Sequence, residues 1–397
     1  MFETLNRLSE DAILGVMAKY RADPSPLKID LGVGVYRDAE GHTPVLECVR
    51  TAERRIVAAQ VTKAYVAPAG REEFNTAVVD LVLGREHPAV RGRRVIAVQT
   101  PGGCGALRVG AELLRAAAPG ASIHVSDPTW ANHLPLLGGA GLRLHRYPYY
   151  DAAKHRLDFD AMIERLERAT AGDVVLLHGC CHNPTGADLD AAQWRVIAEL
   201  LSRRGLVPYL DLAYQGFGVD LDGDAEGVRL IADRVPECLI ATSFSKNLGL
   251  YRERVGALLA VGTSEARVAT IRSHVLQIAR SIYSMPPDHG AAIAVEIFTD
   301  PALRQTWIAE LAAMRERVQA MRRLLAGSLR RHSGGGDYDH FERQRGMFSL
   351  LGASPAVVER LRDEFHVYMT ADGRMNLAGL TPASIEPLAQ AILRATR

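Results

Sequence analysis

The sequence predicts an α/β fold in which a large domain with a mostly parallel sheet is joined to a smaller α+β domain. Three observations support this prediction. The chain has 397 residues, more than the roughly 250–300 at which a single core stops growing. Short apolar segments alternate with helix-length amphipathic ones along most of the chain, a pattern typical of parallel sheets with covering helices. After Pro301 this alternation gives way to one long amphipathic segment.

The composition excludes several classes of protein. Apolar residues make up 48% of the chain and charged residues 23%, as in ordinary globular proteins. With 47 basic and 46 acidic residues, no nucleic-acid or membrane partner is expected. No apolar stretch approaches the roughly 20 residues that span a bilayer, and the N-terminus does not resemble a signal peptide. Five cysteines without a C-x-x-C motif predict a reduced, cytoplasmic protein.

The elements of the large domain follow from short apolar runs bounded by polar or turn residues, which are typical of buried parallel strands. The expected strands are Arg94–Gln99, Ser122–Val125, Val174–His178, Val207–Leu210, Leu239–Thr242 and Gly256–Val261. The expected helices between them include Ala106–Ala117, Asp158–Arg168 and Ala191–Arg203. This alternation predicts a doubly wound sheet.

The C-terminal part has a different organisation. Ala302–Ser328 is amphipathic and rich in arginine and glutamate, and Gly334, Gly335 and Gly336 predict its end. Short strands and helices are expected from Gly346 to Arg397. These segments predict the second, smaller domain.

The first candidate site is the segment Ser243-Phe244-Ser245-Lys246, followed by Arg254. Lys246 comes just after a predicted buried strand, at the carboxyl edge of the sheet where α/β proteins bind ligands. Desolvation there would lower the pKa of the amine and make it nucleophilic. An isolated lysine is usually solvated, but the nearby serines and arginine suit a phosphate group.

A second candidate is the glycine-rich turn Thr100–Leu107, which joins a strand to a helix. Its glycines, among them Gly103, allow the backbone to approach a ligand, and the helix N-terminus favours an anion. The segment matches neither G-x-G-x-x-G nor the P-loop pattern. Such turns also occur for packing reasons alone.

Polar residues at other strand ends complete the candidate site. Asp211 ends an apolar strand and Tyr214 follows it, so a protonated pyridine nitrogen would suit the carboxylate, although a helix cap is equally common. Asn183 is held extended before Pro184. Trp130 could stack on a flat ring, although a lone tryptophan is more often part of the core.

Two arginines, Arg280 and Arg374, could bind the two carboxylates of a dicarboxylate substrate. No metal site is expected. Cys180, Cys181 and His182 are consecutive, and three consecutive residues cannot all point at one tetrahedral metal.

Taken together and in this order, these motifs resemble those of the aspartate and aromatic amino-acid aminotransferases, which are pyridoxal-phosphate enzymes of fold type I. The resemblance runs from Gly32–Asp38 to Gly373-Arg374. Three segments are more similar to the bacterial aromatic branch than to the aspartate branch: Ser126–Trp130, Gly186–Leu189 and Tyr214–Gly218. The resemblance implies a seven-stranded, mostly parallel sheet in a large pyridoxal-phosphate-binding domain over residues 45–300. It implies a small domain over residues 1–44 and 301–397.

The resemblance also implies a role for each matching residue. Lys246 would form the Schiff base with pyridoxal phosphate and shuttle the proton, with Asp211 at the pyridine nitrogen and His133 behind it. The remaining cofactor contacts would come from Gly103, Cys104, Trp130, Asn183, Tyr214, Ser243, Ser245 and Arg254, and from Tyr65 of the other subunit. Gly34, Trp130, Asn183 and Arg374 would contact the substrate, and Arg280 would do so across the dimer. The implied reaction exchanges amino and keto groups between amino acids and 2-oxo acids in a homodimer with shared sites.

The sequence departs from the family at four positions. Cys104 replaces a threonine or serine, Ile282 an asparagine, Met285 a small or polar residue, and Asp372 a serine. These changes leave the cofactor chemistry intact and leave open the choice between aspartate and aromatic substrates. Asp372 could pair with Arg374 or point to solvent.

Three alternatives remain at this stage. A lyase or decarboxylase could use the same scaffold, but Arg280 favours transfer between dicarboxylates. A dinucleotide-dependent oxidoreductase would leave Lys246 and Asp211 unexplained. A binding protein that has kept only the fold would have no reason to retain Lys246, Asp211 and Arg374.

Overall fold

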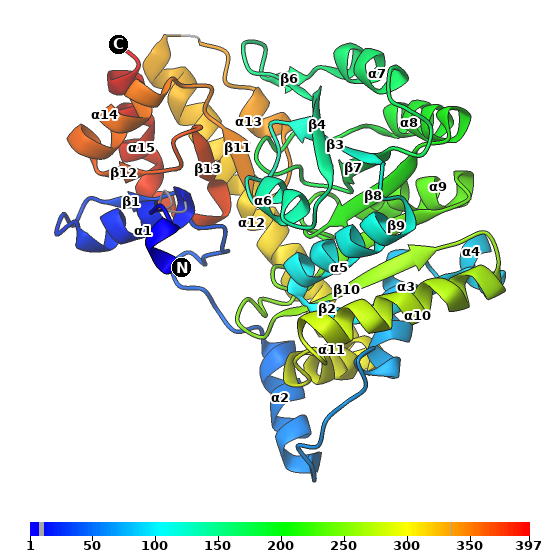
Figure 1. The fold of residues 1–397 in the computed structure, drawn as a ribbon. Coiled ribbons are helices and arrows are strands. Elements are labelled where there is room, and N and C mark those ends of the chain that lie inside the picture. Colours follow the sequence, from blue (N-terminus) through cyan, green and yellow to red (C-terminus); the bar gives the residue numbers. More distant parts are fainter. Residues whose placement is uncertain (8–11, 335) are drawn as a thin grey trace. The chain divides into compact units, whose positions relative to one another are not determined.

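The structure is a computed structural model that describes residues 1–7, 12–334 and 336–397. Its internal contacts divide the chain into two compact units (Figure 1). The smaller unit contains residues 1–43, 184–186 and 317–397, and the larger contains residues 44–183 and 187–316. Among the described residues, no helix has the length and apolar character needed to cross a membrane.

Within the described residues, the larger unit is built on a seven-stranded sheet with the order β2-β10-β9-β8-β7-β3-β4. The strands are β2 (Val95–Pro101), β3 (Ser122–Asp127), β4 (Arg143–Pro148), β7 (Val174–His178), β8 (Val207–Leu212), β9 (Cys238–Ser243) and β10 (Val255–Val261). Only β10 runs antiparallel to its neighbours, β2 and β9. The predicted mostly parallel sheet is confirmed.

The six expected strands all form, and their ends differ by at most two residues from the prediction. The strand of this sheet that was missed is β4, whose sequence mixes arginine and histidine with apolar residues. It lies at the edge of the sheet beside β3 alone, where one face and one side stay partly solvated, so it lacks the continuous apolar run of a central strand.

Helices pack against the sheet and form the core of the larger unit with it. α5 contacts β9 and β10, while α10 contacts β2 (Figure 1). The helices are α2 (Glu47–Ala59), α3 (Glu72–Val82), α4 (Pro88–Arg91), α5 (Gly102–Ala117), α6 (His133–Gly138), α7 (Phe159–Glu167), α8 (Ala191–Arg204), α9 (Glu226–Arg234), α10 (Glu265–Ile282) and α11 (His289–Thr299). A hairpin of β5 (Tyr150–Asp151) and β6 (Arg156–Leu157) lies outside the sheet.

The smaller unit has a separate core, which includes Leu31, Leu325, Met369 and Leu388. Its elements are α1 (Ala12–Ala22), β1 (Ile29–Asp30), α13 (His340–Arg343), β11 (Phe348–Leu350), α14 (Pro355–Phe365), β12 (Val367–Tyr368), β13 (Arg374–Asn376) and α15 (Pro382–Ala395). β1 pairs with β12 and β11 pairs with β13, so segments from both ends of the chain meet in this unit.

The long helix α12 (Pro301–Ser333) begins in the larger unit and ends in the smaller one. The boundary expected at residues 300/301 marks the start of this helix, whereas the contacts divide the chain at residue 316. The difference arises because the first half of the helix packs on the larger unit; Trp307, for example, donates a hydrogen bond to the Asn247 carbonyl at 2.7 Å. Of the three glycines expected to end the helix, Gly335 lies outside the described residues.

Candidate active site

A cavity of about 180 Å³ opens at the carboxyl ends of β7, β8 and β9 in the larger unit. Its lining residues are Gly103, Cys104, Leu107, Trp130, Asn183, Asp211, Ala213, Tyr214, Ser243, Ser245, Lys246 and Arg254. Ten of these twelve were predicted from the sequence. The other two, Leu107 and Ala213, are small or apolar and belong to a helix and a strand-end turn, so nothing in their residue type indicated a site.

Lys246 lies in the turn that follows β9, and this turn is closed by a hydrogen bond from the Gly249 N–H to the Lys246 carbonyl at 3.1 Å. The side chain is only partly exposed, and its Nζ lies 5.1 Å from the centre of the Tyr214 ring. The lysine is therefore not a solvated loop residue. Its amine is inside the cavity, where a carbonyl group of a ligand could reach it.

Asp211 is the buried acid of the cavity, with 8% of its surface exposed. Its Oδ2 lies 3.1 Å from Nε2 of His133, a residue with no exposed surface. Burial raises the pKa of Asp211, but the hydrogen bond and charge of His133 outweigh this effect, with smaller contributions from His178 and Lys246, and leave the pKa below its usual value. The carboxylate is therefore ionised at neutral pH.

Two residues behind His133 were not assigned a role from the sequence. The Thr129 hydroxyl lies 2.8 Å from His133 Nδ1 and 3.3 Å from His178 Nε2. Burial lowers the pKa of His178 to about 3, so its ring is neutral. Because an ionised carboxylate only accepts hydrogen bonds, His133 Nε2 must carry the proton that faces Asp211. Thr129 and His178 hold the His133 ring in that orientation.

Asn183 and Tyr214 form the polar wall of the cavity opposite the glycine-rich turn. Asn183 Nδ2 lies 3.4 Å from the Tyr214 hydroxyl, and the Asn183 N–H donates to His178 Nδ1 at 3.2 Å. The same buried histidine thus contacts both the asparagine and, through Thr129, the histidine behind Asp211. Two hydrogen-bonding groups are fixed side by side on this wall.

The glycine-rich turn and Arg254 form the other end of the cavity. Arg254 Nη1 donates to the Ser245 hydroxyl at 3.3 Å and to the Tyr251 carbonyl at 3.0 Å. α5 begins at Gly102, which has a φ of 69°. A β-carbon on Gly102 would lie 2.6 Å from Arg254 Nη2, so only glycine lets the guanidinium approach the helix N-terminus. A guanidinium beside free helix N–H groups is a binding site for an anion.

Cys104 lies at this anion site, at a position where the resemblance implies a threonine or serine. Its Sγ is 3.8 Å from Asn132 Nδ2. Burial raises the pKa of the Cys104 thiol, although the charges of Arg254 and Lys246 oppose the effect. The group is therefore a neutral thiol, a weaker hydrogen-bond donor than a hydroxyl.

Arg374 and Gly34, the predicted substrate contacts, lie in the smaller unit. Arg374 is 5% exposed and its Nη2 donates to the Gly32 carbonyl at 2.7 Å. Asp372 is exposed, and its carboxylate accepts from the Arg374 backbone N–H at 3.2 Å and from the Thr370 hydroxyl at 2.6 Å. The acid therefore shapes the turn before β13.

The two residues expected to act across a dimer lie outside the cavity. Tyr65 is 94% exposed. Arg280 is exposed at the end of α10, where it contacts the Ser284 hydroxyl. Ile282, at a position where the resemblance implies an asparagine, is 46% exposed beside it, and Met285 is half-buried.

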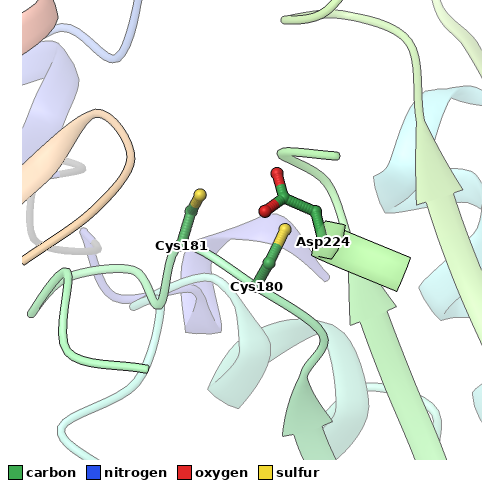
Figure 2. Close-up of side chains that lie close together, drawn as sticks. All are labelled: Cys180, Cys181 and Asp224. Carbon is green, nitrogen blue, oxygen red and sulfur yellow. The ribbon is translucent and has the colours of Figure 1, made fainter. Parts of the chain in front are cut away.

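The side chains of Cys180, Cys181 and Asp224 lie close together, and Figure 2 shows the carboxylate of Asp224 pointing toward the two sulfur atoms. The sequence reasoning missed Asp224. Its carboxylate accepts hydrogen bonds at 2.8 Å from the backbone N–H groups of Gly216, Gly218 and Val219. A hydrogen bond with Cys181, together with burial, raises the pKa of the Cys180 thiol well above its usual value. Because both carboxylate oxygens already accept backbone hydrogen bonds that hold a turn, we assign no metal to the group.

The profile of the family described as "Aminotransferase class I and II" matches residues 26–392. The chain belongs to this aminotransferase family. Among aminotransferases, it is 46% identical over 393 residues to the aromatic-amino-acid aminotransferase of Paracoccus denitrificans, with 99% of each chain covered. It is 44% identical over 393 residues to the aspartate aminotransferase of Escherichia coli, again with 99% of each covered.

Solved aminotransferase structures share the fold over the whole chain. The aromatic-amino-acid aminotransferase of Burkholderia pseudomallei, in a structure covalently bound to pyridoxal phosphate, superposes with a TM-score of 0.97 at 40% identity and 100% coverage of both chains. The family and fold expected from the motifs are thereby confirmed.

Proposed function

We propose that this aminotransferase binds pyridoxal phosphate in the cavity of the larger unit. It would use the cofactor to exchange the amino group of aspartate or aromatic amino acids with 2-oxoglutarate. The observation that carries the proposal is that one cavity is lined by an amine, an ionised carboxylate and a guanidinium, those of Lys246, Asp211 and Arg254. A flat, phosphorylated pyridine aldehyde presents a complementary group to each of the three.

The residues fit this cofactor at both of its ends. The N-terminus of α5 and the guanidinium of Arg254 suit a phosphate dianion, and the missing side chain of Gly102 lets that guanidinium lie beside the helix N-terminus. At the other end, the ionised carboxylate of Asp211 suits a protonated ring nitrogen. When bound, pyridoxal phosphate supplies the electron sink that stabilises a carbanion.

The protein's own groups supply orientation and proton transfer. Lys246 would hold the cofactor covalently and then carry the proton between the two reacting carbons. Asp211, kept ionised by His133, would hold the proton on the ring nitrogen and keep the ring electron-poor. Tyr214 and Asn183 would donate hydrogen bonds to the phenolic oxygen, and Trp130 would lie on the ring face.

The substrate class follows from the arginines and from the names of the relatives. Arg374 would bind the α-carboxylate that all amino-acid substrates share, with Gly34 beside it. Arg280 would bind the second carboxylate of aspartate or 2-oxoglutarate. The relatives named above include both aromatic-amino-acid and aspartate aminotransferases at nearly equal identity. This balance supports activity toward both substrate classes.

We also propose that the enzyme is a homodimer with shared active sites. An exposed strip on α2 and the segment after it includes Val57 (68%), Val61 (96%) and Tyr65 (94%). Apolar and aromatic side chains exposed to this extent are typical of surfaces that a second copy covers. In such a dimer, Tyr65 would reach the partner's phosphate and Arg280 the partner's substrate.

Mixing two inactive variants tests the shared site. Arg280→Ala and Lys246→Ala proteins, dissociated and re-associated together, should recover part of the wild-type activity, because one site in each mixed dimer regains both residues. Re-associated single variants are the controls. Recovery no greater than in these controls would contradict a shared site.

We further propose a cytoplasmic location, supported by the five cysteine thiols, none of which is in a disulfide.

The visible absorption spectrum of the cofactor-loaded protein tests the main proposal. Aspartate and phenylalanine, added in separate cells, should each bleach the band of the lysine-bound cofactor, and 2-oxoglutarate should restore it. No band after addition of pyridoxal phosphate would contradict the cofactor assignment. Release of carbon dioxide or ammonia, without restoration by 2-oxoglutarate, would indicate a lyase or decarboxylase, which the names of the relatives do not favour.

A further inference from the structure

Arg322 is a fully buried arginine in α12 for which the proposed chemistry provides no direct role. It has no exposed surface and is among the largest completely buried side chains. Its guanidinium donates to the carbonyls of Phe341 (3.2 Å), Arg345 (3.2 Å), Gly346 (2.8 Å) and Phe348 (2.6 Å) and to the Ser349 hydroxyl (2.7 Å). All of these groups belong to the smaller unit.

These hydrogen bonds fix the segment that leads into β11. Segments without regular structure leave backbone carbonyls unpaired, and burying such groups is costly unless a donor reaches them. The planar guanidinium offers five N–H donors in a rigid arrangement, which suits several carbonyls at once. Arg322 therefore holds the backbone from Arg345 to Phe348, the first residue of β11, through hydrogen bonds to its carbonyls.

Phe348 in turn lies against Arg374. The Arg374 guanidinium carbon is 4.5 Å from the centre of the Phe348 ring, within the range of a cation–π interaction. Their strands are paired, with Leu350 opposite Arg374 in the antiparallel register of β11 and β13. The ring supports one face of the guanidinium.

The same ring also leaves no space for a side chain at the position of Gly34. A β-carbon on Gly34 would lie 2.8 Å from Phe348 Cζ, so a side chain at this position would displace the ring. The neighbouring backbone is held by the β13 strand, since Asn376 Nδ2 donates to the carbonyls of Val33 at 2.6 Å and Val35 at 2.8 Å. Phe348 thus contacts both predicted substrate-binding residues of the smaller unit.

We propose that Arg322 is a positioning residue for substrate binding: through the Phe348 ring, it fixes the Arg374 guanidinium in the orientation that receives the α-carboxylate. This inference rests on the proposed role of Arg374. In this role, Arg322 touches neither substrate nor cofactor. Its effect should be the same for every amino acid, because the α-carboxylate is the group that all substrates share.

The test compares substrate kinetics of Arg322→Met, Arg322→Lys and a matched control, Arg317→Met. Arg317 lies in the same helix and donates to the Asp38 and Leu380 carbonyls of the same unit at 2.7 and 2.5 Å, and neither of these acceptors belongs to the segment from Phe341 to Ser349. Arg322→Met should raise KM for aspartate and for phenylalanine by the same factor, about tenfold, with kcat nearly unchanged. Arg322→Lys should give a smaller increase, and Arg317→Met should lower the melting temperature without changing KM.

Phe348→Leu keeps the experiment informative if Arg322→Met does not fold. It should raise both KM values in the same proportion, and combining it with Arg322→Lys should add less than the two separate effects, because both changes act on one ring. Equal melting-temperature losses with unchanged KM in the Arg322 and Phe348 variants would overturn the inference, as would an increase confined to aspartate. If no amino acid bleaches the cofactor band of the wild-type enzyme, the proposed function is overturned instead. The two failures are therefore distinguishable.

Discussion

Replacing His133 by phenylalanine should test how the enzyme keeps Asp211 ionised. The change removes the donor 3.1 Å from Asp211 Oδ2 and keeps a ring of similar size in a site with no exposed surface. Burial, which raises the pKa of Asp211, would then act without its main opposing interaction. The pKa should move from below its usual value to above it.

The expected loss of stability can be worked from this arrangement. A hydrogen bond to a charged group contributes about 1.5–3 kcal/mol, and breaking a fully buried ion pair costs about 3–5 kcal/mol. Asp211 is 8% exposed and lines the cavity, so water can reach it. We therefore expect His133→Phe to lower the free energy of unfolding of the cofactor-free protein by about 2 kcal/mol at neutral pH.

The sign of the pH dependence follows from the two pKa values. In the wild type, the folded-state pKa of Asp211 lies below the unfolded value, so its stabilising contribution is present at neutral pH and is lost as the pH falls below about 4. In the variant, the folded-state pKa lies above the unfolded value, so the penalty is present at neutral pH and disappears on acidification. The difference between the two proteins should therefore shrink toward acid pH.

Urea unfolding of the cofactor-free proteins, followed by tryptophan fluorescence at pH 7 and at about pH 3.5, measures this difference. The Asp211→Asn background is the control, since its amide does not titrate and any pH dependence of the His133→Phe effect that remains there comes from groups other than Asp211. A His133→Phe penalty that is equal at both pH values in the Asp211 protein would refute the reasoning.

Three further changes address the cofactor site and the turn that Asp224 holds. Lys246→Ala should lower kcat by about a thousandfold or more and leave no cofactor attached to the protein after borohydride treatment; a trapped adduct would remove Lys246 from its role. Arg254→Gln should raise the dissociation constant of pyridoxal phosphate about 10- to 100-fold, since it loses a charged hydrogen-bond donor to the phosphate; equilibrium dialysis measures it, and unchanged binding would argue against the anion site. Asp224→Ala should lower the free energy of unfolding by about 3 kcal/mol, because three backbone N–H groups lose their acceptor; calorimetry measures it, and a loss of less than about 1 kcal/mol would show that water replaces the carboxylate.

The sequence by itself determined the sheet, because each central strand is a continuous apolar run between turn residues. Such a run is typical of a strand that is buried on both faces in a sheet covered by helices. The same logic located the site: Lys246, Asp211 and Asn183 are polar residues at the ends of such runs or within five residues after them, and the carboxyl ends of parallel strands meet at one edge. The edge strand Arg143–Pro148 was not predicted because it contains exposed polar side chains and is not a continuous apolar run.

Only the tertiary structure decided which residues support those side chains. Thr129 and His178 are far apart in sequence and meet behind His133 because β3 and β7 are neighbours in the sheet. In the sequence, nothing distinguishes Arg322 from other arginines of an amphipathic helix. Only the fold shows that it is buried and hydrogen-bonded to carbonyls that include the one of Phe348. Local sequence patterns indicate which segments are buried and where strands end. Contacts between distant segments depend instead on how the elements pack, and a single sequence does not show that packing.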